Sequence, residues 1–130
     1  MHVVCGIAGL GENILICKRG RGGPYAGRWE FPTALPEAGE MLEDCLERSL
    51  FERFSLNLGR FERFCSFDSA SKGNFRVHAF RVDGGGVKPP FSGYDDAKWV
   101  NVKKLSRFPL VPDAVTLVNV LQKNIVISPH

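Results

Sequence analysis

The 130-residue sequence lacks several features that would place it in a specialised class of protein. It contains no signal peptide and no apolar run long enough to span a bilayer, so we expect a cytoplasmic protein that does not cross a membrane. Neither sign of charge dominates, because 17 basic and 14 acidic residues leave a net charge of only +3. Such a small and dispersed excess does not predict a nucleic-acid groove.

The cysteines are too few and too widely spaced for a disulfide framework or a zinc site. Cys5, Cys17, Cys45 and Cys65 form no Cys-x-x-Cys pair and have no histidine at zinc-ligand spacing. Most of them lie in apolar runs. We therefore expect buried free thiols, as in proteins of a reducing compartment.

The composition is that of an ordinary globular domain. Hydrophobic residues make up 44% and charged residues 24% of the chain, which argues against disorder. This length suits a single domain, residues 1–130, that buries a real core. Phe51, Phe54, Phe61 and Phe64 could belong to that core or to a dimer surface, so the sequence leaves a homodimer open.

The spacing of apolar residues predicts strands divided by two main helices. The expected elements are strands at 3–10 and 14–18, a helix at 40–55, strands at 60–69 and 74–82, a loop at 83–92, a strand at 97–102, a helical turn at 103–107 and a helix at 112–123. This arrangement fits an α/β fold of the α/β/α sandwich type, with a mixed β-sheet between helices.

The expected helix at 40–55 carries polar residues on its apolar side. Its apolar residues recur mostly at three- and four-residue intervals: Leu42, Cys45, Leu46, Leu50 and Phe54. At about 100° per residue, Ser49 and Arg53 fall in the same arc and should face inward. Two interpretations of Arg53 stay open. Its stem could pack on the core while its head reaches water, or it could lie beneath a pocket and meet an anion.

Residues 27–56, GRWEFPTALPEAGEMLEDCLERSLFERFSL, resemble the signature of Nudix hydrolases, G-x5-E-x7-R-E-U-x-E-E-x-G-U, where U is a bulky aliphatic residue. The positions that match are Glu40, Arg48, Leu50, Glu52 and Leu56. The positions that fail are Ala34, Ser49, Arg53 and Ser55, which stand where the signature has glycine, glutamate, glutamate and glycine.

The resemblance implies a hydrolase whose helical glutamates bind Mg²⁺ and activate water, with an arginine and a glutamate, here Arg48 and Glu40, bracing the helix against the preceding loop. Of the implied metal ligands, only Glu52 keeps its carboxylate. Mg²⁺ needs about six oxygen ligands, and the charge of Arg53 repels a nearby cation. We therefore expect Mg²⁺ to bind weakly, only together with substrate, or not at all.

Similarity to MutT-type members of that family, which hydrolyse nucleoside triphosphates, extends over about residues 3–122. It is carried by ILICKRG with its Arg19, by AGRWEFP at 26–32, and by FRVHAFRV, AKWVNVKKL and FPLVPDAVTLV further on. Asp113 falls near a base-contacting position of relatives, or else only begins the last helix. Arg21 and Arg19 flank Gly20 in a glycine-rich loop that could approach phosphate or could be a solvated tip. His78 is either a structural or a rim residue.

Two functions stay open. In the first, the protein binds a nucleotide or another phosphorylated small molecule, such as a nucleoside diphosphate derivative, with weak or absent hydrolysis; its ligand-binding candidates are Arg19, Arg21, Arg53, His78 and Asp113.

In the second, the chain is an active divergent pyrophosphohydrolase. Glu52 would be its metal ligand, supported by Arg48 and by substitute carboxylates from Glu40, Asp95 or Asp96. Adjacent strand residues point to opposite faces, so at most one of the two aspartates could reach the site.

Overall fold

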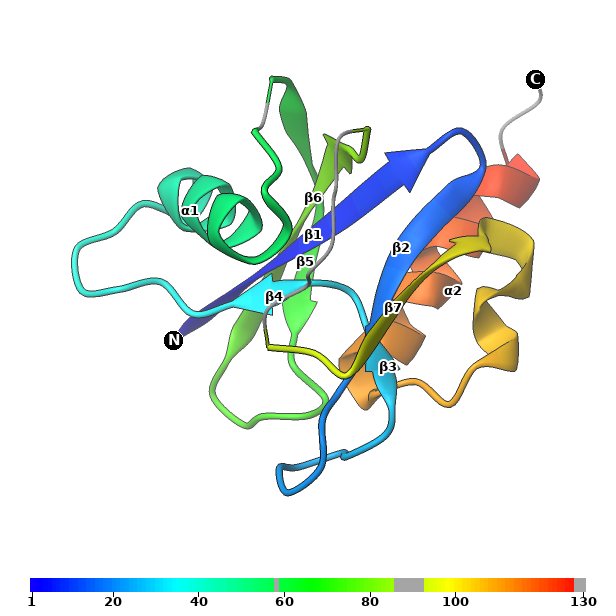
Figure 1. Cartoon of the computed structure of the whole chain (residues 1–130), viewed down its shortest axis with the longest axis horizontal. Helices are drawn as coiled ribbons and strands as arrows, with labels where there is room; N and C mark the ends of the chain where they lie inside the picture. Colours follow the sequence, from blue (N-terminus) through cyan, green and yellow to red (C-terminus); the bar gives the residue numbers. More distant parts are fainter. Residues whose placement is uncertain (58, 86–92, 128–130) are drawn as a thin grey trace.

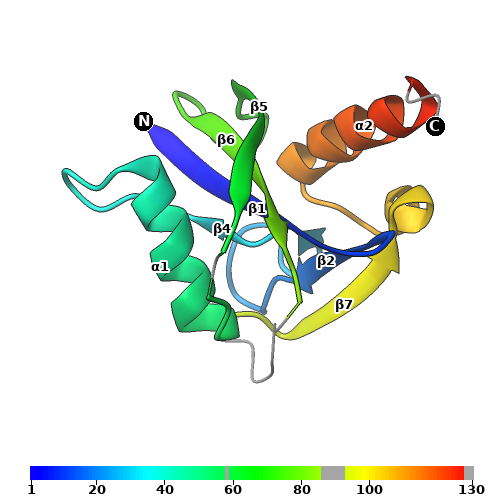
Figure 2. The same cartoon turned by 90° about the horizontal axis from the view of Figure 1, so that it is seen from above.

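The computed structural model describes residues 1–57, 59–85 and 93–127, the last four of them by their backbone alone. These residues form a seven-stranded sheet with helix α1 on one side and helix α2 on the other (Figure 2). Within these residues, no helix is long and apolar enough to cross a membrane.

The sheet is mixed, as predicted (Figure 1). The elements in chain order are β1 (His2–Leu10), β2 (Asn13–Lys18), β3 (Trp29–Glu30), β4 (Thr33–Ala34), α1 (Leu42–Phe54), β5 (Phe61–Asp68), β6 (Arg76–Asp83), β7 (Asp96–Asn101), the 3-10 helix η1 (Val102–Arg107) and α2 (Pro112–Ile127). The strand order is β3-β2-β1-β6-β5, with β4 also pairing with β1 and β7 with β2. Strand β1 runs parallel to β6 and antiparallel to β2 and β4.

The central strand β1 is buried on both faces and so divides the core into two clusters. Cys5 and Ile7 point to the α2 side, whereas Val4 and Ala8 point to the α1 side. Gly6 lets α1 come close, because a Cβ atom there would lie 3.4 Å from leucine side chains of that helix. The predicted α/β/α sandwich is confirmed.

Helix α1 begins at Leu42 rather than at Glu40. Met41 keeps an extended backbone, with ψ at 150°. The carboxylate of Glu40 accepts the backbone N–H of Glu37 and the guanidinium of Arg48, so Glu40 belongs to the turn before the helix. The sequence pattern placed the start of the helix two residues too early, because glutamate is also common in a first helical turn.

The other predicted elements agree with the structure to within two residues, except that α2 continues to Ile127. Most of the loop predicted at 83–92 lies outside the described residues. Of the ambiguous aromatic residues, Phe54 is fully buried and Phe51 is 57% exposed. All four cysteines are free, but Cys65 is only half-buried, because it lies on the edge strand β5.

We expect Gly84→Ala to lower the free energy of unfolding by about 1–3 kcal/mol through overpacking. A Cβ atom at Gly84 would lie 2.5 Å from a ring carbon of Trp99 and 3.0 Å from the carbonyl oxygen of Gly9. Urea unfolding measures the loss. The matched control is Gly73→Ala, where the new Cβ would meet nothing within 4 Å. Equal stabilities of the two variants would contradict this packing.

Candidate functional site

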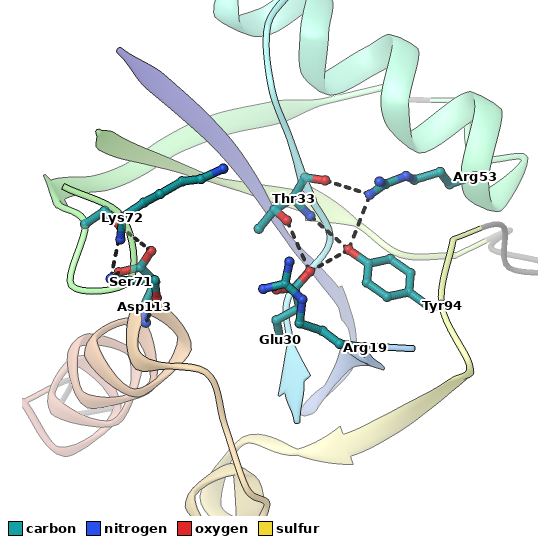
Figure 3. Close-up of polar contacts among 9 residues, drawn as sticks. Arg19, Glu30, Thr33, Arg53, Ser71, Lys72, Tyr94 and Asp113 are labelled. Carbon is teal, nitrogen blue, oxygen red and sulfur yellow. Dashed lines mark hydrogen bonds and ion pairs between the residues drawn. The ribbon is translucent and has the colours of Figure 1, made fainter. Parts of the chain in front are cut away.

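A cavity of about 360 Å³ lies between the sheet and the start of α2. Its apolar lining comes mainly from Val3, Phe31, Val77, Val111 and Ala114. Its polar lining falls into two groups, which Figure 3 shows apart from each other: Arg19, Glu30, Thr33 and Arg53 in one, and Ser71, Lys72 and Asp113 in the other. A mostly apolar hollow with a few convergent polar groups is typical of small-molecule sites.

Arg53 reaches from α1 across to the sheet, as the helical periodicity predicted. Its Nη1 donates hydrogen bonds to the carbonyl oxygen of Thr33 at 2.6 Å and to the phenolic oxygen of Tyr94 at 3.3 Å. The guanidinium carbon also lies 5.2 Å from the centre of the Tyr94 ring. The positive charge is therefore held in one place at the edge of the cavity.

A buried carboxylate connects Arg53 with Arg19. Glu30 is only 5% exposed, and its Oε2 accepts hydrogen bonds from the hydroxyl groups of Tyr94, at 2.9 Å, and Thr33, at 3.2 Å. Its Oε1 lies 3.5 Å from Nη1 of Arg19. Burial and the nearby Glu30 raise the pKa of Tyr94 well above its usual range, so the phenol remains a donor.

Asp113, at the other end of the cavity, holds a loop in place. Its carboxylate accepts hydrogen bonds from the Ser69 hydroxyl at 2.6 Å and from the backbone N–H groups of Ala70, at 2.6 Å, and Ser71, at 3.3 Å. Asp113 lies in the first turn of α2, where a negative charge is favoured. Its carboxylate thus fixes the Ser69–Ser71 loop while still lining the cavity.

Arg48 holds both of the signature glutamates. Its Nε and Nη2 donate to the two carboxylate oxygens of Glu40 at 2.8 and 3.0 Å, and its Nη1 donates to Glu52 at 3.2 Å. The hydrogen bonds from Arg48 and from the Glu37 backbone lower the pKa of Glu40 to about 2. The implied brace between the helix and the preceding loop is present.

The side chains around Glu52 do not fit a bound magnesium ion. A cavity of about 330 Å³ beside Glu52 is lined by Arg48, Ser49 and Arg53, so one carboxylate faces two guanidinium groups. Across residues 1–57, 59–85 and 93–127, no three His, Cys, Asp or Glu side chains are grouped to hold a metal ion. Mg²⁺ prefers carboxylate and water oxygens in a near-octahedral shell, and this wall of the site supplies mainly positive charge.

Comparison with protein families decides the ancestry of this site. The model of the NUDIX domain family matches residues 2–121. The chain belongs to the Nudix family. No curated protein matches the sequence.

Solved Nudix structures share the whole fold. The MutT structure from work on the Aliivibrio salmonicida and Vibrio cholerae proteins is similar at 25% identity and a TM-score of 0.80, over 94% of this chain and 97% of that one. The E. coli ORF135 protein is similar at 23% identity and a TM-score of 0.83, over 98% and 92% of the two chains. The NUDIX domain of Shewanella oneidensis NrtR, complexed with ADP ribose, is similar at 16% identity and a TM-score of 0.77, over 96% and 88%.

The Nudix fold brings together most of the predicted ligand-binding residues. Arg19, Arg53 and Asp113 line the main cavity, and Arg21 lines a neighbouring cavity together with Arg19 and Arg53. The exception is His78. It pairs in register with Val4, whose side chain packs on the α1 side of the sheet, whereas the main cavity lies on the α2 side.

His78 instead forms a hydrogen bond of 2.9 Å with the ring of His2. Burial and the neighbouring His2 lower its pKa. The prediction that His78 contacts the ligand is therefore corrected, because alternation along β6 turns its side chain away from the cavity.

Asp95 and Asp96, the candidate substitute carboxylates, lie outside the lining of the site. Neither lines any of the cavities that Arg53 borders. Asp95 lies beside Gly20, and the Asp96 carboxylate accepts the N–H of Ala97. Tyr94, next to them in the chain, is the residue that enters the site.

The sequence interpretation missed Glu30, Tyr94, Thr33 and Lys72. Glu30 offered one clue, a carboxylate between the apolar residues Trp29 and Phe31, which indicates a buried charge that needs partners. The partners themselves come from distant positions of the chain, so no local pattern pointed to them.

We expect the ion pair of Glu40 to make stability depend on pH in a defined window. Because the pKa of Glu40 falls from 4.5 to about 2 on folding, its contribution is complete above pH 4.5 and is lost as the pH falls towards 2. The destabilisation caused by Glu40→Gln should therefore shrink over that window, whereas Glu47→Gln, at an exposed position, should show no such trend. Chemical unfolding at a series of pH values measures the free energy of unfolding of both variants. If the loss caused by Glu40→Gln did not change with pH, the link between this ion pair and stability would be refuted.

Proposed function

We propose that the protein binds a nucleotide or a nucleoside diphosphate derivative in the main cavity, with weak or absent magnesium-dependent hydrolysis. The observation that carries this proposal is the placement of Arg53. Its guanidinium is hydrogen bonded at the cavity edge to Thr33 and Tyr94, at a position where the Nudix signature has a glutamate that the resemblance implies to be a metal ligand.

The charges of the cavity favour an anionic ligand. Arg19, Arg53 and Lys72 line it, and both of its carboxylates already have partners. Guanidinium groups bind phosphate through charge-assisted hydrogen bonds without a metal. An anion at this end of the cavity would therefore gain attraction from the arginines while Glu30 stays neutralised.

The same change removes what hydrolysis requires. Metal-assisted cleavage depends on an ion that lowers the pKa of a bound water. A guanidinium carries a permanent charge but does not give up its proton at any relevant pH, so it supplies attraction without a base. Glu52, the remaining signature carboxylate on α1, is 55% exposed and paired with Arg48.

The relatives support the class of ligand. MutT is among the similar structures, and the NUDIX domain of NrtR was crystallised with ADP ribose, a nucleoside diphosphate derivative. The cavity volume of about 360 Å³ also lies within the usual range of about 300–1,000 Å³ for small-molecule sites. Magnesium contributes in this proposal only through the phosphates of the ligand itself.

We expect nucleotide affinity to depend on Arg53 and not on metal. Calorimetric titration with nucleoside triphosphates and ADP ribose in EDTA should give the same ligand preference as in Mg²⁺. Arg53→Met should weaken binding by about tenfold or more, the effect of losing a hydrogen bond to a charged group. Arg107→Met, at an exposed position of η1, is the control and should bind normally. Binding that vanishes in EDTA and survives in Arg53→Met would refute the proposal.

We expect turnover to be slow or absent for the same ligands. Chromatography of the nucleoside monophosphate formed in Mg²⁺ should give no more product for the wild type than for Glu52→Gln, because Glu52 lacks the neighbouring carboxylates that gather the ion. Brisk product formation that is abolished by Glu52→Gln would instead identify an active divergent hydrolase.

A further inference from the structure

Among the residues that the structure describes, none forms a hydrogen bond with one edge of the Arg53 guanidinium. The hydrogen bonds of this side chain to Thr33 and Tyr94 both come from Nη1. Its Nε and Nη2 form no hydrogen bond with any residue that the structure describes. These two groups lie on the same edge of the planar guanidinium, which is the edge that binds two oxygens of one carboxylate or phosphate.

Gly93 lies beside this part of the guanidinium, since a Cβ atom there would lie 4.0 Å from the guanidinium carbon of Arg53. A Cβ atom at Gly93 would lie 3.8 Å from both Nε and Nη2 of Arg53. Gly93 has a φ of 88°, a conformation that most side chains disfavour, so the position is well suited to staying bare. No side chain at position 93 therefore covers this edge of Arg53.

Arg53 and Gly93 line one cavity together, and most of the charged residues around it are basic. A cavity of about 310 Å³ is lined by Arg19, Arg21, Arg53 and Gly93, with Glu30 as its sole acidic residue among those described. Three guanidinium groups therefore face one carboxylate among the lining residues, which leaves an excess of positive charge, with the Asp95 carboxylate beside the lining residue Gly20. Glu52 does not line it.

We propose that this cavity is a metal-free oxyanion site. A phosphoryl group of the ligand accepts the Nε–H and Nη2–H of Arg53 through two of its oxygens, with Arg19 and Arg21 on the facing loop. The proposal rests on the proposed function and gives it a direction: the phosphates turn away from the carboxylate of Glu52 and towards the 19–23 loop. Because Gly93 has no side chain, the phosphates have room to approach Arg53.

An isosteric pair of variants tests the site. Gly93→Asp places a carboxylate beside the free edge of Arg53, whereas Gly93→Asn adds nearly the same volume without charge. Asp and Asn both tolerate a positive φ better than other residues. Thermal unfolding of both variants checks that they remain folded to the same extent.

The readout is calorimetric binding of inorganic pyrophosphate in EDTA. We expect the wild type and Gly93→Asn to bind within a few-fold of each other, and Gly93→Asp to bind at least about tenfold more weakly, because its carboxylate occupies the guanidinium edge. Equal affinities of the Asp and Asn variants, or no pyrophosphate binding by the wild type, would overturn the oxyanion site. The nucleotide titration of Arg53→Met is read separately. If Gly93→Asp has no effect but Arg53→Met still loses nucleotide affinity, only the placement of the phosphates is wrong.

Discussion

The hydrogen bonds from Arg53 to Thr33 and Tyr94 are the constraint on which the rest of the site depends. They join α1, strand β4 and the segment before β7, three parts of the chain that are remote in sequence. Through Tyr94 they also reach the buried Glu30, and through Glu30 the cation of Arg19. The two arginines thus stand on either side of one carboxylate, which offsets part of their repulsion and fixes the distance between them.

In the proposed function, this arrangement separates ligand binding from hydrolysis. In a metal-dependent site the cation that attracts phosphate also activates water, so affinity and turnover rise together. A guanidinium keeps the attraction and loses the activation. Meanwhile Arg48 and Glu40 retain the brace that holds α1 on the sheet, so the scaffold survives the change of charge. In the proposed function, the fold keeps a nucleotide-sized cavity while its helix no longer gathers divalent ions.

Much of the scaffold follows from local patterns in the sequence, whereas the contacts inside the site do not. The periodicity of α1 predicts that Ser49 and Arg53 face inward, and the resemblance to the Nudix signature implies the pair of Arg48 and Glu40. Neither pattern predicts the contact between Arg53 and Tyr94, because that contact depends on how β7 and α1 pack on the sheet. His78 shows the same limit: alternation gives two faces, but only the pairing of β6 with β1 decides which face holds the cavity.

The most direct test of the account is a titration of the ligand-free protein with Mn²⁺, followed by electron paramagnetic resonance. Mn²⁺ takes the same oxygen ligands as Mg²⁺ and its free form is counted directly. We expect no saturable site in the wild type, and a new site in the double variant Ser49→Glu with Arg53→Glu, which restores the two lost carboxylates. Tight, saturable Mn²⁺ binding by the wild type would contradict the claim that a fixed guanidinium has replaced the metal.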